Sequence, residues 1–261
     1  MESELLMYEQ ELVYAQKAAT QAVEKLKKQT KVNVDSAEGK DIKLAMDKES
    51  EAVIMKCLGP SNIPILSEEH GLWNGTGVSL KKGKLWIIDP LDGSANYWKG
   101  MRELTCVSIA LWEDGKPVLG VINRFFCDEL FVGIVGVGAW LNDKPITTSV
   151  TGQISQAVLA TGFPLKRSYE SSNLERSIKQ IQNFKKIRML GTAAVMGAFV
   201  ACGRVDAYVE EEIMLWDIAA SGALVLAAGG KVEIKELEDY KCICRMFANE
   251  ELKGSYYANC V

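Results

Sequence analysis

The chain has 261 residues, of which 48% are hydrophobic and 25% charged, and its 30 Lys and Arg against 34 Asp and Glu give a net charge of -4. This is the composition of a folded globular protein, long enough for one large domain or two small ones. The acidic balance, without a long basic tract, argues against a nucleic-acid partner, and the single histidine excludes a site built from several histidines.

The cysteines and the apolar segments indicate the compartment. No uncharged apolar run is long enough to span a membrane and the first residues do not have the pattern of a signal peptide, so we expect a cytoplasmic protein with no membrane partner. The seven cysteines are an odd number and lie mostly in apolar stretches, which favours reduced, buried thiols. Cys242 and Cys244 have no second pair at a matching distance, so they do not indicate a zinc site.

The first part of the chain alternates between helical and extended patterns. Apolar residues from Leu5 to Leu26 recur every three or four positions, which predicts a long helix. The patterns that follow predict an extended piece at 40–47, a helix at 48–58, a strand at 63–67 and a buried strand at 85–88 that stops at Asp89-Pro90.

The middle of the chain is rich in strands. We predict strands at 104–112, 117–123 and 129–135, with a hairpin turn at Asp114-Gly115. Gly133, Gly136 and Gly138 are interpreted as turn glycines, because their order is reversed from the dinucleotide-binding fingerprint and no helix start follows.

After residue 147 the pattern changes to alternating strands and helices, which indicates an α/β half. The predicted elements are strands at 157–161, 187–190 and 207–209 and helices at 171–184, 193–201 and 218–228. We therefore divide the chain into an N-terminal α+β domain, residues 1–146, and a C-terminal α/β domain, residues 147–261.

Acidic residues follow several of these apolar runs. Glu68 follows the strand at 63–67, Asp89 and Asp92 follow the run at 85–88, and Asp217 precedes a helix. Because ligands gather at the ends of strands, these positions are candidates for a site.

The segment from Asp89 to Ser94 is the most specific of these. Two carboxylates on either side of a proline would repel each other unless a cation lay between them, and Mg²⁺ with its preference for oxygen ligands is suitable. The carbonyl of Leu91 could join the ligands, the Ser94 hydroxyl could hold a water, and the N–H groups at Gly93 to Ala95 could meet a phosphate. The segment therefore indicates metal-assisted phosphoryl transfer to water.

The net charge supports the same interpretation. A pocket formed by five carboxylates would repel a phosphate ester, so metal ions and substrate are expected to bind together. The five are Asp47, Glu68, Asp89, Asp92 and Asp217.

The sequence Asp89-Pro-Leu-Asp-Gly-Ser-Ala-Asn-Tyr97 resembles the D-P-[IL]-D-G-[TS]-x-N-[FY] signature of the inositol monophosphatase family. Trp216-Asp217-Ile-Ala-Ala resembles the second signature of that family, W-D-x-A-[AG]. Further similar segments are Ser67–Glu69, Gly138–Ile146 and Gly191–Ala194, so the resemblance runs from about residue 41 to residue 230.

The resemblance implies a Mg²⁺-dependent, lithium-sensitive phosphomonoesterase, usually a homodimer, with the layered αβαβα architecture of sugar phosphatases. Two or three ions are implied: Glu68, Asp89 and the Leu91 carbonyl hold the first, Asp89, Asp92 and Asp217 the second. Glu68 and Ser94 activate the water, with Asp47 orienting Ser94. The amides of Gly93 and Ser94 hold the phosphate, and Asp92, Ala193, Glu210 and Asp217 face the substrate.

The chain departs from the family pattern at two positions near this site. Leu44 replaces a threonine, which affects the hydrogen bonding around Asp47 and a third metal there. Ser94 replaces the usual threonine but keeps the hydroxyl. In addition, the acidic run Glu210-Glu211-Glu212 favours a polyol over a second phosphate at the substrate edge.

Several functions stay open at this point. Inositol monophosphate is favoured as the substrate. The same signatures also serve 3'(2'),5'-bisphosphate nucleotidases, fructose-1,6-bisphosphatases, histidinol-phosphatases and NADP phosphatases. A regulatory binding protein without activity is disfavoured, because all five carboxylates are present. His70 is interpreted as a surface residue in a glycine-rich loop, residues 70–84, which we expect to be mobile and to cover part of the site.

Overall fold

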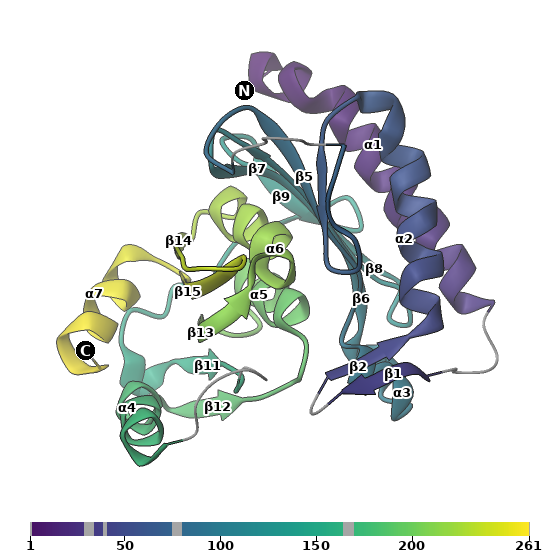
Figure 1. Cartoon of the computed structure of the whole chain (residues 1–261). Helices are drawn as coiled ribbons and strands as arrows, with labels where there is room; N and C mark the ends of the chain where they lie inside the picture. The colour runs from purple at the N-terminus through teal and green to yellow at the C-terminus, as the bar shows by residue number, and fades with distance from the viewer. Residues whose placement is uncertain (1, 29–33, 39–40, 75–79, 164–169, 261) are drawn as a thin grey trace.

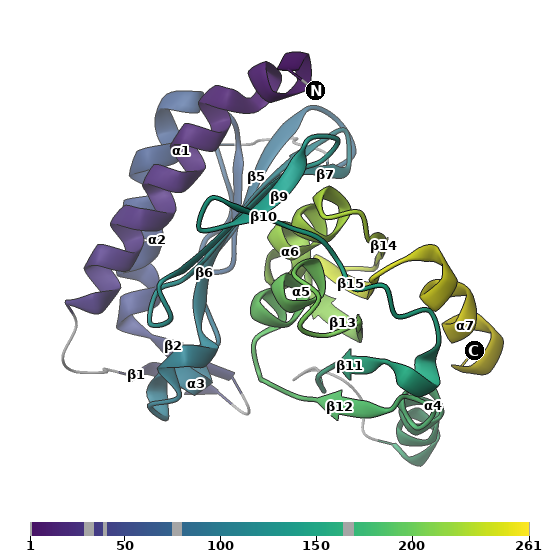
Figure 2. The ribbon, with the colours of Figure 1, turned by 180° about the vertical axis from the view of Figure 1, so that it is seen from behind.

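The structure is a computed structural model that describes residues 2–28, 34–38, 41–74, 80–163 and 170–260. Five layers follow one another across the molecule (Figures 1 and 2). Helices α1 (Glu2–Lys27) and α2 (Ala45–Leu58) cover one face of a large sheet, and α5 (Ala193–Ala201) and α6 (Leu215–Ala227) cover the other. A second sheet follows, with α4 (Ser171–Ile181) and α7 (Glu250–Cys260) outside it. The predicted αβαβα layering is confirmed.

The large sheet has eight strands, and its only parallel pair joins β3 to β5 among the described residues. Its order is β10 (Lys144–Ile146), β9 (Gly138–Leu141), β8 (Glu129–Ile134), β7 (Lys116–Arg124), β6 (Cys106–Glu113), β5 (Lys84–Asp92), β3 (Ile65–Ser67) and β4 (Gly71–Trp73). The predicted turn at Asp114-Gly115 joins β6 to β7 with φ of 50° and 78°.

The smaller sheet has five strands, in the order β12 (Lys186–Arg188), β11 (Val158–Ala160), β13 (Ala207–Met214), β15 (Lys241–Phe247) and β14 (Lys231–Glu236). Strands β1 (Val34–Glu38) and β2 (Asp41–Leu44) form a separate pair, and α3 (Ser94–Trp98) follows β5. Short 3₁₀ turns cover Gly59–Ser61, Arg102–Leu104 and Ile154–Gln156. The chain changes sheets after β10, but α5 and α6 contact both sheets, and the domain division at residue 146 stays a prediction.

Three apolar clusters hold the layers together. In β5, Trp86 and Ile88 face α1 and α2, whereas Leu85 and Ile87 face α5 and α6. Both faces of the strand are therefore buried, which explains its unbroken apolar run. The third cluster packs α7 on the outer face of the smaller sheet, around Tyr256.

Several predicted boundaries were wrong. Helix α2 begins at Ala45 and not at residue 48, because Leu44 is its N-cap and Asp47 lies in its first turn. Helix α6 begins at Leu215 and not at residue 218, so that Asp217 also lies in a first turn. Strand β5 does not stop at Asp89 but continues to Asp92 through an irregularity in its pairing.

The glycine interpretation was also partly wrong, since Gly133 lies inside β8 and Gly138 begins β9. Of the three, Gly136 has the left-handed conformation of a turn, with φ of 85°. Part of the expected loop at 70–84 is strand β4, and residues 75–79 lie outside the described ones.

The helices and the cysteines bear on the predicted compartment. None of the helices in the described ranges is long and apolar enough to cross a membrane. All seven cysteines are free, and five of them are buried, the others being Cys127 and Cys202.

Helix α6 lies directly on two glycines of the large sheet. A Cβ added at Gly120 would lie 2.3 Å from the carbonyl oxygen of Ala220, and one added at Gly133 would lie 2.9 Å from the Leu224 side chain. Real side chains do not approach so closely, so these glycines set the distance between α6 and the sheet.

We expect Gly120→Ala to lower the free energy of unfolding by about 1–3 kcal/mol, because the added methyl forces α6 away from the sheet. Urea unfolding followed by circular dichroism measures this. The control is Gly254→Ala in α7, where nothing lies within 4 Å, and which we expect to raise stability by about 0.5–1 kcal/mol. Equal effects of the two substitutions would contradict the packing role of Gly120.

Candidate active site

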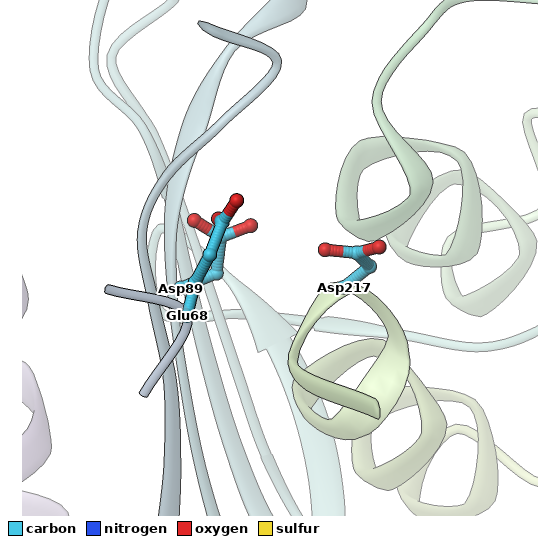
Figure 3. A group of neighbouring side chains, drawn as sticks. All are labelled: Glu68, Asp89 and Asp217. Carbon is cyan, nitrogen blue, oxygen red and sulfur yellow. The ribbon is translucent and has the colours of Figure 1, made fainter. Parts of the chain in front are cut away.

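The carboxylates of Glu68, Asp89 and Asp217 meet in one group. Each offers an oxygen that lies within 4.8 Å of the other two, and Asp89 is buried. Figure 3 shows Glu68 and Asp89 side by side, facing Asp217 at the start of α6. The structure thus brings together residues from the turn after β3, from β5 and from α6, which are separated in the sequence.

The sheet register explains why Glu68 and Asp89 are neighbours. Strands β3 and β5 are parallel, with Leu66 beside Ile87 and Ser67 beside Ile88. Glu68 follows Ser67 directly after the end of β3, and Asp89 follows Ile88 within β5. Leu66 and Ile87 face α5 and α6. Because side chains alternate along a strand, Asp89, two residues after Ile87, points to the same face, where α6 carries Asp217.

A β-bulge turns Asp92 to the same face as Asp89. Asp89 pairs with Ser108 and Asp92 pairs with Cys106, so three steps along β5 match two along β6. In a regular strand, two residues three apart point to opposite faces. The extra residue in the bulge, at a segment where Pro90 cannot donate to the ladder, puts both carboxylates on the face toward α5 and α6.

Asp92 is tied to the start of α5. Its Oδ2 accepts hydrogen bonds from the Thr192 hydroxyl and from the amide of Ala194, at 2.8 Å for the latter, and lies 3.8 Å from the Cys106 sulfur. Asp92 stands outside the group of three carboxylates, and its role as a metal ligand stays a prediction.

Asp47 and Ser94 approach each other beside the group. The Ser94 Oγ lies 3.0 Å from the Leu91 carbonyl oxygen and 3.4 Å from Asp47 Oδ2, within reach of both as a donor. Asp47 Oδ2 also accepts from the Leu44 amide at 2.8 Å. The backbone of Leu44 therefore serves Asp47, and the leucine side chain that replaces the family's threonine is buried in the core between α1, α2 and the sheet.

Burial and mutual repulsion dominate the electrostatics. Burial raises the pKa of Asp89 well above its usual range, and Glu68, Asp92 and Asp217 raise it further. The pKa of Asp217 is raised by burial and then by Glu68, Asp92 and Glu210. Burial raises the pKa of Asp92 to about 6 although the hydrogen bonds from Thr192 and Ala194 act in the opposite direction.

These residues fit a hard divalent cation. The donors are all carboxylate oxygens, the ligand type that Mg²⁺ prefers. Burial and the neighbouring acids raise the pKa values of Asp89 and Asp217, and a bound cation would relieve this repulsion. The Leu91 carbonyl faces Ser94 at the same strand end. Cys242 and Cys244 are not in this group.

Three of the predicted substrate contacts come from separate elements: α5, the end of β5 and β13. Ala193 is the first residue of α5, and Gly93 has φ of 89°, with no room for a Cβ, which would lie 2.6 Å from the Leu104 carbonyl. Glu210 lies on β13 and accepts a hydrogen bond from the Tyr208 hydroxyl at 2.8 Å.

The three consecutive glutamates do not form one acidic surface. Glu211 faces the other side of β13, where Gln180 donates to it at 3.1 Å and Arg245 lies 3.9 Å away. Glu212 has φ of 61° at an irregularity of the pairing. Of these three glutamates, Glu210 alone is among the residues that raise the pKa of Asp217.

Sequence reasoning missed several residues that hold the site. Thr192 bonds Asp92, and Asn96 donates to the carbonyls of Leu190 and Leu104, at 2.8 and 3.0 Å. A polar residue just before a predicted helix was a signal for Thr192. His70 was expected on the surface. Its side chain is 59% exposed but pairs with the fully buried carboxylate of Glu51, which no pattern indicated.

Comparison with known proteins identifies the family of this chain. The sequence model of the inositol monophosphatase family matches residues 7–240. The chain belongs to this family. It is 34% identical to Inositol monophosphatase 2 of Solanum lycopersicum over 224 residues, which are 83% of this chain and 84% of that protein. It is 40% identical to Nus factor SuhB of Xylella fastidiosa over 190 residues, 72% of this chain and 66% of that protein.

A solved structure of a family member has the same fold. The inositol monophosphatase from Anabaena (Nostoc) sp. superposes with a TM-score of 0.82 at 34% identity, covering 96% of this chain and 95% of that one. The family relationship supports a phosphatase function for this chain.

We expect Asp217→Asn to raise the melting temperature of the metal-free protein by about 2–4 °C at pH 8 and to leave it unchanged near pH 4. The folded state raises the carboxylate pKa values from about 3.8, so above that pH it binds more protons than the unfolded chain, and stability falls as pH rises. Calorimetry in the presence of a chelator measures the shift.

The matched control is Asp128→Asn, because Asp128 is exposed and pairs only weakly with Lys27. Mg²⁺ should stabilise the wild-type protein more at pH 8 than at pH 5, since protons compete for the same oxygens. A melting temperature of Asp217→Asn that equals that of the wild type at pH 8 would contradict repulsion as the dominant effect.

Proposed function

We propose that this protein is a Mg²⁺-dependent phosphomonoesterase with a small sugar or polyol phosphate as substrate, inositol monophosphate being favoured. The meeting of Glu68, Asp89 and Asp217 in one group around the buried Asp89 carries the proposal. Family membership supports phosphate ester hydrolysis. Inhibition by lithium, a cytoplasmic location, a homodimer and the absence of a nucleic-acid partner stay predictions.

The ions would be held by this group together with two further oxygen donors. Glu68, Asp89 and the Leu91 carbonyl are proposed for one ion, Asp89, Asp92 and Asp217 for a second, and the surroundings of Asp47 for a weaker third. Bound Mg²⁺ supplies the positive charge that lets a phosphate enter an acidic pocket and that stabilises the charge developing on its oxygens.

The chain's own residues handle the water and its protons. In the proposed reaction, a carboxylate oxygen of Glu68 accepts a proton from the attacking water. The Ser94 hydroxyl orients this water, and the contact of 3.4 Å from Ser94 Oγ to Asp47 Oδ2 supports the role of Asp47 in holding that hydroxyl. The amides of Gly93 and Ser94 are proposed to bind the phosphate. Attack by the water in line with the leaving oxygen would invert the configuration at the phosphorus atom.

Glu210 supports a polyol substrate. The Tyr208 hydroxyl holds its carboxylate, which accepts hydrogen bonds and repels a second phosphate. Because several relatives bear the name Nus factor SuhB, family membership alone does not select inositol. A regulatory protein without activity is the alternative, and the retained carboxylates argue against it.

We expect the wild-type protein to release phosphate from inositol 1-phosphate at millimolar Mg²⁺ and to stop when the metal is chelated. A colorimetric phosphate assay over a panel of inositol, fructose, nucleotide, histidinol and NADP phosphates tests this. Glu68→Gln and Asp217→Asn should each reduce kcat by at least about 100-fold, because each removes a charged group from the reacting centre.

Glu49→Gln and Asp128→Asn are the matched controls, since both positions are exposed and lie in surface ion pairs. They should keep wild-type activity. No hydrolysis of any phosphomonoester by the wild-type protein would overturn the proposed function, and a fully active Glu68→Gln would remove Glu68 from the mechanism.

We expect Glu210→Gln to raise KM for inositol 1-phosphate by about fivefold to tenfold, a loss that corresponds to one hydrogen bond to a charged group. Hydrolysis of p-nitrophenyl phosphate, which has no hydroxyls to bind, should be unchanged. Steady-state kinetics on the two substrates separate these effects. Equal losses on both would assign Glu210 to the metal site and not to the substrate.

A further inference from the structure

The start of α2 carries buried polar residues on one face. Ser50 and Glu51 follow Asp47 by three and four positions, which places both of them next to Asp47 on the helix surface. Ser50 and Glu51 are fully buried and Asp47 nearly so. A helix normally turns an apolar stripe to the core, so three polar side chains in this place need a reason.

Each of the three side chains bonds a different segment of the site. Asp47 Oδ2 faces the Ser94 hydroxyl, and Ser50 Oγ donates to the Pro90 carbonyl at 2.8 Å. Glu51 accepts from the Ser67 hydroxyl through Oε1 and pairs with Nδ1 of His70 through Oε2. The helix is thereby linked to the strand ends that carry Asp89 and Glu68.

The Glu51 carboxylate bonds side chains on both sides of Glu68 in the sequence. Ser67 precedes Glu68 and His70 follows two residues later, so both carboxylate oxygens of Glu51 are used in this one stretch. Burying a carboxylate is costly unless it is hydrogen-bonded, and its two partners here belong to the segment that holds Glu68.

The regular pairing of the large sheet ends before Glu68. Strand β3 has three residues, and its pairing with β5 ends at Ser67 beside Ile88. Its other neighbour, β4, is equally short and ends the sheet on this side. Glu68 thus lies just beyond the last residue of β3 that pairs with β5.

We propose that Glu51 is a positioning residue that, through Ser67 and His70, holds Glu68 in place against Asp89 and Asp217. This role rests on the proposed function of the site. Glu51 is not one of the residues proposed to hold the ions or the substrate. His70 is the second partner of the Glu51 carboxylate. In this proposal the single histidine therefore acts by holding Glu51, and not as a metal ligand or a catalytic base.

The test compares two substitutions of His70 and two of Glu51. Asparagine can offer an amide N–H close to where Nδ1 of the histidine lies, so His70→Asn keeps a donor for Glu51 and His70→Ala does not. Glu51→Gln keeps an acceptor for Ser67, and Glu51→Ala keeps nothing. Glu49→Gln, on the same helix but exposed, is the control.

The main measurement is Mn²⁺ binding to the substrate-free protein, followed by electron paramagnetic resonance. Supporting residues around metal ligands typically change affinity about tenfold or more, so we expect His70→Ala and Glu51→Ala to weaken binding by about tenfold. His70→Asn and Glu51→Gln should stay within about threefold of the wild type. The Mg²⁺ concentration for half-maximal activity should follow the same order, while KM for substrate at saturating Mg²⁺ changes little.

His70 decides the outcome if Glu51→Ala does not fold, because its side chain is 59% exposed and its replacement leaves the core intact. Mn²⁺ affinity of His70→Ala equal to that of the wild type, or equal loss in His70→Ala and His70→Asn, would overturn the positioning role. If the wild-type protein itself neither binds Mn²⁺ nor hydrolyses a phosphate ester, the proposed function fails, and the positioning role fails with it.

Discussion

Repulsion between buried carboxylates is the constraint on which the site depends. Burial and the neighbouring acids raise the pKa values of Asp89 and Asp217 well above their usual range, so the folded chain holds charges together that water would keep apart. Hydrophobic packing elsewhere must outweigh this cost. Without a cation, the arrangement of acids is unfavourable. A divalent cation would relieve the repulsion, and the carboxylate oxygens favour metals that bind oxygen ligands.

The fold resists this repulsion from two sides of the large sheet. On one side, α2 bonds the strand ends through Ser50 and Glu51. On the other, the start of α5 binds Asp92 through Thr192 and Ala194, and α6 carries Asp217 against glycines of the sheet. The acids of the strands therefore lie between two helical layers, each of which is fixed by its own apolar cluster.

Most of the fold and the acidic residues could be predicted from sequence, because they depend on local patterns. The run before Asp89 marks a buried strand, and Gly93 and Ser94 follow within the same signature. The β-bulge could not be predicted, since Asp89 and Asp92 reach one face only through the pairing of β5 with β6. The hydrogen bond from Thr192 to Asp92 and the pairing of Glu51 with His70 could not be predicted either, because each joins residues that lie apart in the sequence. For the residues after 230, which form β14, β15 and α7, no helix or strand was predicted from the sequence.

The middle layer makes the site a shared property of the whole molecule. Helix α6 packs on the large sheet through Leu224 and on the smaller one through the core that contains Cys244, so both sheets determine where Asp217 stands. Glu68 and Asp89 come from one half of the chain and Asp217 from the other, so neither half can set the spacing of the three carboxylates alone. In evolutionary terms, such a site cannot move to another protein as a small exchangeable segment. It can be inherited only with the layered architecture that surrounds it.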